Sequence, residues 1–213
     1  GGTDQVRQAH TALMAGLALA IPRSRWLLVA APILAVLTWQ RNQLWADEAA
    51  LWADAAAGNP GSADAAYGHA EALRFAGRWQ QAEVAYERVL TLRPGDDDAL
   101  VGLGVAQMRQ LRPDDAEATW LRALVANPRN CAAHNDLARL HLDRDEIRPA
   151  LTEYASTLYW CPTDLTALRE LGRLNDEMGD VRRARDFYSR YLELAPPSIE
   201  RREVEEAWLK VAP

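Results

Sequence analysis

Cysteine is scarce in this chain of 213 residues, which contains only Cys131 and Cys161. Two cysteines so far apart in sequence do not supply the closely spaced thiolate pairs that are typical of structural zinc sites. The chain also lacks a basic excess, because its 30 acidic residues outnumber 24 basic ones. Nucleic acid requires a basic protein surface for its phosphates, and we therefore expect no nucleic-acid partner.

A recognisable catalytic constellation is missing as well. No nucleophilic side chain has an evident base partner in the sequence. Gly102 and Gly104 lie within a predicted helix, whereas glycines that bind phosphate follow a strand. His134 and His141 share one helical face, but both occupy inward-facing positions where packing is the ordinary role. We therefore predict no enzyme activity, no metal site and no cofactor.

The sequence does contain a repeat with a period of 34 residues. It is marked by five prolines, Pro60, Pro94, Pro128, Pro162 and Pro196. The same spacing relates the alanines Ala82, Ala116, Ala150 and Ala184 and the aromatics Tyr86, Trp120, Tyr154 and Tyr188. A period of this length is typical of stacked helix–turn–helix units.

Each unit predicts two antiparallel helices. The first carries apolar or small residues on its packing face, such as Leu103 and Gly104 in the second unit. The second carries an alanine, an aromatic residue and a leucine at four-residue spacing, such as Ala116, Trp120 and Leu124. This spacing is the buried stripe of an amphipathic helix.

The turn between the two helices of a unit calls for a left-handed residue. Gly77 and Gly179 occupy this position in the first and fourth units. Leu111 and Asp145 replace the glycine in the second and third units. We expect these replacements to weaken individual units without disturbing the period.

These residues resemble the tetratricopeptide repeat family. The resemblance covers four full units, 63–96, 97–130, 131–164 and 165–198. It implies an all-α fold, a right-handed solenoid of helix–turn–helix hairpins. Residues 199–213 carry Val204, Trp208 and Val211 on one face and predict the helix that caps the C-terminal end of the stack.

The repeat is only half kept before residue 63. Trp52 lies 34 residues before Tyr86, so residues 44–62 predict the second helix of a unit whose first helix has been replaced. Residues 1–43 contain in its place an uncharged apolar segment, residues 26–39, with Trp26 and Trp39 at its two ends.

This apolar segment predicts a membrane anchor. Fourteen helical residues reach about 21 Å, which is less than the ~30 Å hydrocarbon core. A buried solenoid helix and a surface-lying helix are therefore alternatives, but the terminal tryptophans and the flanking arginines Arg25 and Arg41 favour membrane insertion. Arginines are more frequent before the segment than after it, so we expect the repeats on the extracytoplasmic side.

A second resemblance lies at the start of the repeats. The run from Leu37 to Leu44, followed by Trp45 and later by Asn59 and Pro60, is similar to a junction in polytopic transmembrane-and-tetratricopeptide proteins of the O-mannosyltransferase type. The resemblance implies repeats that present protein acceptors to a membrane active site. The acidic catalytic motif of such enzymes has no match here, so this chain would be only their C-terminal arm.

The two cysteines fall at matching ends of one hairpin. Cys131 opens the first helix of the third unit and Cys161 closes its second helix. Antiparallel helices bring these positions together, so the thiols could form a disulfide that persists outside the reducing cytosol. The alternative is a pair of small buried thiols.

The first helices predict a concave groove that binds an extended protein or peptide partner. Its candidate lining residues, by repeat position, are Tyr67, Glu71, Arg74, Val101, Val105, Met108, Asn135, Arg139, Leu142, Arg169 and Arg173. The lining changes from mixed and apolar to basic along the stack, which suits a partner with an acidic segment. The alternative is a groove filled by the capping helix or by a neighbouring chain.

Three functions are compatible with these features. The first is a membrane-tethered scaffold that mediates protein–protein interaction or complex assembly through the groove. The second is the acceptor-binding arm of a larger membrane glycosyltransferase, which requires membrane helices before Gly1. The third is a soluble repeat adaptor or subunit of a larger complex.

Overall fold

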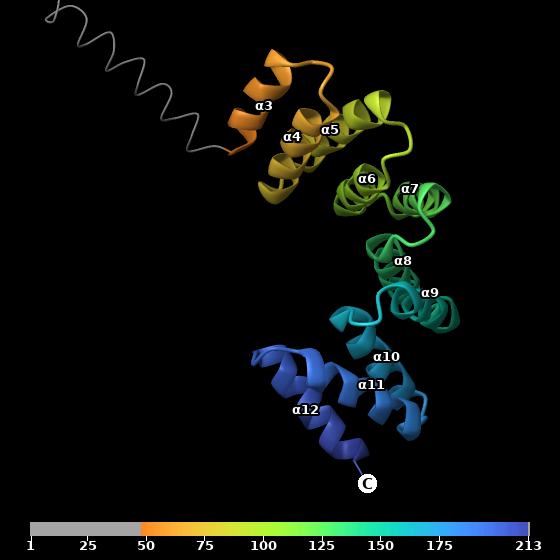
Figure 1. The fold of residues 1–213 in the computed structure, drawn as a ribbon. Coiled ribbons are helices and arrows are strands. Elements are labelled where there is room, and N and C mark those ends of the chain that lie inside the picture. Colours follow the sequence, from red (N-terminus) through yellow and green to blue (C-terminus); the bar gives the residue numbers. More distant parts are fainter. Residues whose placement is uncertain (1–47, 213) are drawn as a thin grey trace, which may run out of the picture. The chain divides into compact units, whose positions relative to one another are not determined.

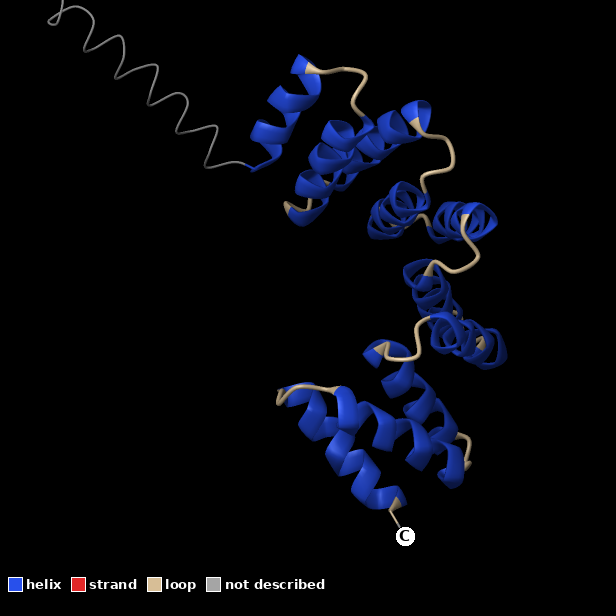
Figure 2. Cartoon of the chain, in the orientation of Figure 1, coloured by secondary structure: helices blue, strands red, loops and turns tan. Residues whose placement is uncertain are grey.

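A computed structural model describes residues 48–212 of the chain as helices joined by short loops, with no strand among them (Figures 1 and 2). The helices are α3 (Glu48–Gly58), α4 (Ala63–Phe75), α5 (Trp79–Leu92), α6 (Asp97–Arg109), α7 (Pro113–Ala126), α8 (Cys131–Asp143), α9 (Ile147–Trp160), α10 (Leu165–Glu177), α11 (Val181–Leu194) and α12 (Ile199–Val211). The predicted membrane anchor and most of the predicted junction lie outside the described residues. No helix within residues 48–212 is long and apolar enough to cross a membrane.

Four helical hairpins follow one another in chain order. They are α4–α5, α6–α7, α8–α9 and α10–α11, and each second helix also packs on the first helix of the next hairpin. The helix α12 packs on α11, where Val204 and Val211 are buried and the Trp208 indole N–H donates to Ser189 Oγ at 3.0 Å. The predicted all-α solenoid is confirmed.

The aromatic residue of each second helix is the centre of its unit. Trp120 is fully buried between Ala116, Leu137 and Leu140. A Cβ added to Gly104 would lie 2.3 Å from Trp120 Nε1, which no real contact allows. A small residue is therefore required on the first helix wherever the ring of the second helix presses against its backbone.

The N-terminal end of the stack keeps this arrangement in part. Trp52 on α3 occupies the repeat position of the buried aromatics, and its ring lies against Gly68. Trp52 is nevertheless 38% exposed, whereas its equivalents are almost fully buried. The ring of Trp52 therefore has less cover than the aromatic of any later unit.

Polar N-cap residues recur every 34 residues and begin the first helices and α12. They are Ser62, Asp96, Asn130, Asp164 and Ser198. In each case the side-chain oxygen accepts a hydrogen bond of 2.8–3.1 Å from the backbone N–H three residues on. Such caps stabilise a helix start by about 1 kcal/mol each.

The turn inside each hairpin is left-handed in all four units. The φ angle is 69° at Gly77, 60° at Leu111, 59° at Asp145 and 80° at Gly179. Replacement of the glycine has therefore not changed the backbone conformation. A left-handed conformation costs an L-residue roughly 1–2 kcal/mol, less for aspartate than for leucine.

Leu111→Gly is expected to stabilise the protein. The leucine side chain is 88% exposed and contributes little packing, so relief of the backbone strain should raise the free energy of unfolding by about 1 kcal/mol. Urea denaturation measures the difference. Asp145→Gly serves as the comparison and should raise the free energy of unfolding by less. A Leu111→Gly variant that is less stable than the parent would show that the turn is not strained.

Candidate functional site

The candidate binding surface is the exposed side of the first helices, which we call the first-helix face. Helix α6 contacts both α4 and α8, so these three first helices lie next to one another. None of the eleven predicted lining residues is fully buried: Arg139 is exposed and the other ten are half-buried. The structure thus places all of them on helices of this face.

Polar groups at the α4 end are already paired. Glu71 accepts hydrogen bonds from Arg74 Nε at 3.0 Å and Nη2 at 2.7 Å, and from the Tyr86 hydroxyl. Burial would raise the pKa of Glu71, but the hydrogen bonds from Arg74 and Tyr86 lower it overall. Burial and the charge of Glu71 raise the pKa of Tyr67 to about 12. This end presents an ion pair beside an aromatic hydroxyl.

The middle of the face is apolar. Val101, Val105 and Met108 on α6 are half-buried and pack against the core around Trp120. Leu142 on α8 packs in the same way against the next core cluster. These side chains therefore support the core and also form the floor of the first-helix face.

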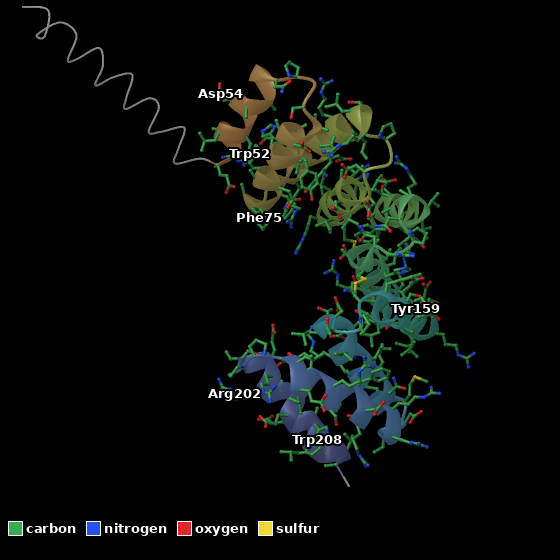
Figure 3. The ribbon with its side chains drawn as sticks, in the orientation of Figure 1. Trp52, Asp54, Phe75, Tyr159, Arg202 and Trp208 are labelled. Atoms are coloured by element: carbon green, nitrogen blue, oxygen red, sulfur yellow. A yellow bond between two sulfur atoms is a disulfide. The ribbon has the colours of Figure 1, made fainter. Side chains whose placement is uncertain are left out.

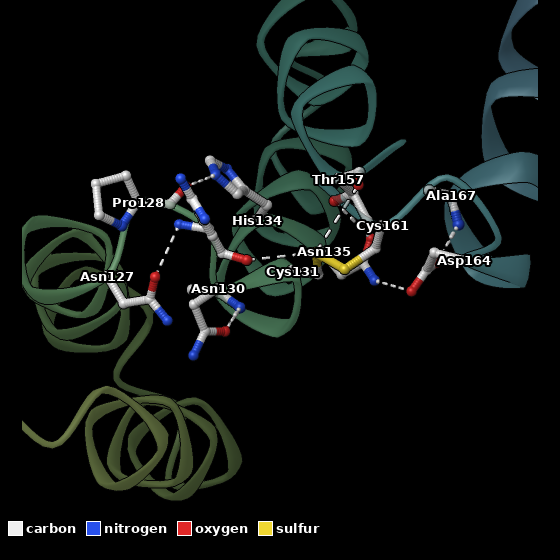
Figure 4. The surroundings of a disulfide bond; sticks show 12 residues. Asn127, Pro128, Asn130, Cys131, His134, Asn135, Thr157, Cys161, Asp164 and Ala167 are labelled. Atoms are coloured by element: carbon white, nitrogen blue, oxygen red, sulfur yellow. Dashed lines mark hydrogen bonds between the residues drawn. A yellow bond between two sulfur atoms is a disulfide. The ribbon is translucent and has the colours of Figure 1, made fainter. Parts of the chain in front are cut away.

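Asn135 is fixed by its neighbours. Its side-chain N–H donates to Asp164 Oδ2 at 3.1 Å, and its Oδ1 accepts from Thr157 Oγ1 at 3.0 Å (Figure 4). Both ends of the amide are thus occupied within the chain. Asn135 therefore joins α8 to α9 and to the start of α10.

Arg139 has a carboxylate partner on its own helix. Its Nη2 lies 2.8 Å from Asp136 Oδ1, three residues earlier. The pKa of Asp136 is raised, because burial disfavours its charged form more than Arg139 and Arg74 favour it. The charge of Arg74 on α4 therefore also favours the ionised form of this α8 carboxyl.

The arginines of α10 are balanced in the same way. Glu170 lies 3.1 Å from Arg169 and 2.9 Å from Arg173, and Glu177 lies 2.6 Å from Arg173. The part of the face predicted to be basic therefore contains its own carboxylates. These ion pairs could have been predicted from the sequence, because the carboxylates lie one, three and four residues from the arginines. The prediction considered only the lining positions and so missed them.

A hollow of about 310 Å³ lies at the C-terminal end of the face. The residues that line it are Arg169, Glu170, Arg173, Tyr188, Glu203, Val204 and Ala207. The last three belong to α12, so the capping helix forms one wall of this hollow and leaves it open. The sequence analysis gave a groove filled by the capping helix as an alternative, and the structure places α12 beside the arginines of α10 without filling this hollow.

A disulfide joins Cys131 at the start of α8 to Cys161 just after α9, with their Cα atoms 6.4 Å apart (Figure 4). The bond closes a loop with a sequence separation of 30 residues. It ties the two ends of the third hairpin together beside Asn135 and Thr157.

The histidines of α8 bind carboxylates rather than each other. His134 Nδ1 lies 2.6 Å from Glu153 Oε2, and its Nε2 lies 3.2 Å from the carbonyl oxygen of Pro128. His141 Nδ1 lies 2.6 Å from Glu146 Oε2. Among the described residues, no three histidine, cysteine, aspartate or glutamate side chains are grouped as a metal site would require.

Stability is expected to fall as the pH rises through the titration of His134. The hydrogen bond to Glu153 raises the pKa of His134 above its usual 6.5 despite burial. Because the pKa of His134 is higher in the folded than in the unfolded protein, protonation of this histidine stabilises the fold. The stabilisation is complete below the pKa of the unfolded protein, about 6.5, and is lost as the pH rises through the pKa of the folded protein.

The measurement compares the parent with His134→Leu, since leucine stands at this repeat position in Leu100 and Leu168. The parent should lose stability relative to the variant as the pH rises above about 6.5, the usual pKa of histidine. The difference between the two proteins cancels the opposite contribution of His69, whose pKa is lowered by burial. A difference that does not change with pH would contradict the assignment.

Comparisons with known proteins agree with this architecture. The tetratricopeptide repeat family model matches residues 67–130, 101–158 and 135–199. Human general transcription factor 3C polypeptide 3 is 32% identical over 124 residues, a match that covers 56% of this chain and 12% of that protein. The chain thus spans only about an eighth of this relative's length.

Solved structures show the same fold. A thermophilic TPR protein of Thermus thermophilus superposes with a TM-score of 0.63 at 22% identity, covering 81% of this chain and 96% of that one. MamA gives 0.58 at 18% identity, covering 75% and 87%. YrrB, described as a TPR protein with an unusual peptide-binding site, gives 0.56 at 17% identity, covering 81% and 88%. Since the family model covers more than half of the chain, this protein belongs to the tetratricopeptide repeat family.

Proposed function

We propose that this chain is a scaffold that binds an extended segment of a partner protein on its first-helix face. The observation that carries the proposal is the row of eleven side chains from four successive first helices, none of which is fully buried. YrrB, a TPR protein with an unusual peptide-binding site, supports the same class of function.

The chemistry of the face defines the partner. The apolar floor formed by Val101, Val105 and Met108 suits aliphatic side chains, and the paired charges on both sides suit a segment of mixed charge. An acidic residue of the partner could replace Glu177 on Arg173, because Glu177 is 56% exposed and such surface pairs contribute little. An acidic segment of the partner therefore fits at the α10 end of the face, but no part of the face requires one.

The test uses a phage-displayed library of random peptides selected on the purified protein. Selected peptides should bind in solution, and Arg139→Glu should weaken them roughly tenfold by reversing an exposed charge of the face. Arg202→Glu on α12 makes the same charge change away from the face and should leave affinity unchanged. Peptides that bind the parent and Arg139→Glu equally well would place recognition elsewhere.

We further propose that the repeats work outside the reducing cytosol, on the extracytoplasmic side. The disulfide supports this, because such bonds persist in oxidising compartments and are rare in the cytosol. Alkylation of free thiols in freshly lysed source cells measures the redox state directly. Full labelling of Cys131 and Cys161 would contradict the proposal.

We also propose two ways in which the first-helix face could be held at a membrane. The chain is tethered through residues 26–39, or it is part of a larger membrane glycosyltransferase. The mass of the native polypeptide isolated from source-cell membranes separates them. A band near 23.7 kDa favours a tethered scaffold, and a band two or three times larger favours an arm of a polytopic protein. Recovery away from membranes would contradict both.

A further inference from the structure

The outer side of α9 differs from the same surface of the other second helices. Its residues Leu151, Thr152, Ala155, Ser156 and Tyr159 form an uncharged strip, which we call the α9 strip. The repeat supplies the comparison, because the equivalent five positions on α5, α7 and α11 all include charged residues. These are Glu83, Glu87 and Arg88 on α5, Glu117 and Arg122 on α7, and Arg185, Asp186, Arg190 and Glu193 on α11.

Charged residues of the second helices in the first two hairpins form ion pairs with the next hairpin, and the third hairpin lacks the equivalent pair. Glu83 lies 2.8 Å from Arg112 of the next hairpin, and Glu117 lies 2.6 Å from Arg144 of the hairpin after it. At the third hairpin Leu151 replaces the glutamate, and Met178 stands at the repeat position of Arg144. The Met178 side chain is 60% exposed, so the exchange extends the uncharged surface toward α11.

An ordered aromatic group marks one end of the α9 strip. Tyr159 is 73% exposed and packs edge-on against Trp160, with ring centroids 4.6 Å apart (Figure 3 labels Tyr159). The guanidinium carbon of Arg129 lies 5.0 Å from the Trp160 ring centroid. The disulfide holds these groups together, since Cys161 follows Trp160 and Cys131 lies two residues after Arg129.

Tyrosine, tryptophan and arginine are the residues most enriched at the energetic centres of protein interfaces. Here they are held by ring contacts and a covalent bond, so little conformational entropy remains to be lost on binding. The α9 strip and Trp160 line a shallow hollow of about 480 Å³. An anchor side chain of a partner would fit there.

The strip offers few outward hydrogen-bond donors. Thr152 Oγ1 donates to the carbonyl oxygen of Arg148 at 3.1 Å, and Ser156 Oγ donates to that of Thr152 at 3.0 Å. Because the Thr152 and Ser156 hydroxyl hydrogens are used within the helix, the hydroxyl of the exposed Tyr159 is the outward donor of the strip, and the rest of the outward surface is mostly methyl and ring. This favours an apolar partner surface over a sugar or another polyhydroxyl ligand.

The flanks of the strip are basic. Arg148 lies one turn before Leu151 on the same side of α9, and it makes no ion pair within the described part of the chain. Arg129 lies at the opposite end, over Trp160. The nearby carboxylates Glu146 and Glu153 are occupied by histidines. An uncharged strip between two arginines is complementary to an apolar segment with a carboxylate at each end.

We propose that the α9 strip docks an amphipathic helix of a partner protein. Leu151, Ala155 and Tyr159 are spaced four residues apart along about 12 Å, which matches the rows of side chains on a helix that packs alongside. The partner helix places aliphatic residues along this row and acidic residues against Arg148 and Arg129. This site is separate from the first-helix face and does not depend on its function.

The experiment is a subtractive selection. A library of displayed helices with randomised outer positions is first depleted on Ala155→Arg and then selected on the parent protein. Ala118→Arg, an identical exchange on the exposed outer side of α7, is the matched control. Selected helices should be rich in aliphatic and acidic residues, bind Ala118→Arg like the parent, and bind Ala155→Arg at least roughly tenfold more weakly.

A double charge reversal, Arg129→Glu with Arg148→Glu, should also weaken the selected helices, and exchanging their acidic residues for lysine should restore binding. Failure to enrich helices on the parent, or equal binding to Ala155→Arg, would overturn the proposal. Two other results would also overturn the proposal. The parent could cosediment with phosphatidylserine–phosphatidylcholine vesicles in a way that Ala155→Arg abolishes, which would indicate a membrane surface. The parent could form a dimer, detected by light scattering, that Ala155→Arg dissociates, which would indicate a second copy of this chain.

Discussion

Trp120→Ala is expected to lower the free energy of unfolding by about 3–5 kcal/mol. Trp120 is the largest of the fully buried side chains among residues 48–212 and contacts both its own hairpin and the next. Its removal leaves a cavity that Gly104 cannot fill, and it also removes the indole hydrogen bond to the Val101 carbonyl oxygen at 3.3 Å. The floor of the first-helix face should loosen with it.

Urea denaturation followed by circular dichroism measures this loss. Val125→Ala on the same helix is the control, since Val125 is well exposed and should change stability by less than about 0.5 kcal/mol. A Trp120→Ala variant that unfolds like the parent would show that the units do not depend on a buried aromatic centre.

Removing the disulfide is the second large effect. Replacing both Cys131 and Cys161 by serine should lower stability by about 3–4 kcal/mol, because the unfolded chain regains the freedom that a closed loop of this length denies it. Domains are stable by only about 5–15 kcal/mol in total. The third hairpin should therefore become the weakest part of the stack.

A reducing agent gives the same comparison without mutation. Dithiothreitol should lower the urea midpoint of the parent to that of the double serine variant and should leave the variant itself unchanged. If the reductant does not move the midpoint of the parent, the two sulfurs are not bonded in solution.

The hairpins of the described region were predictable because their signals are local and repeated. The buried aromatics, the small residues facing them and the left-handed turn positions all recur at one spacing. The N-caps recur at the same spacing, two residues after each proline. A cap satisfies backbone N–H groups of its own helix, so it too can be read from sequence.

The repeat period predicted on which helices the candidate lining residues lie, but not how their charges are paired. All eleven lie on the four first helices, and none of their side chains is fully buried. The pairing of Arg139 with Asp136 follows from helical spacing and was open to prediction. The bond from Tyr86 to Glu71 joins two helices, and the wall that α12 adds beside Arg173 depends on how the last helix packs. Such contacts follow from packing between helices, which a repeat pattern does not specify.

The disulfide also sets how the stack extends under tension. A repeat of 34 residues that opens when the chain is pulled from its ends would lengthen by roughly 110–120 Å, at about 3.3–3.6 Å per residue. In the third unit the bond spans 30 of these residues, so opening adds only about 10–20 Å. An oxidised chain would therefore yield three long steps and one short one, and a reduced chain four long steps. The bond thus limits the distance to which tension can separate a partner bound to the first hairpin from a partner bound to the last.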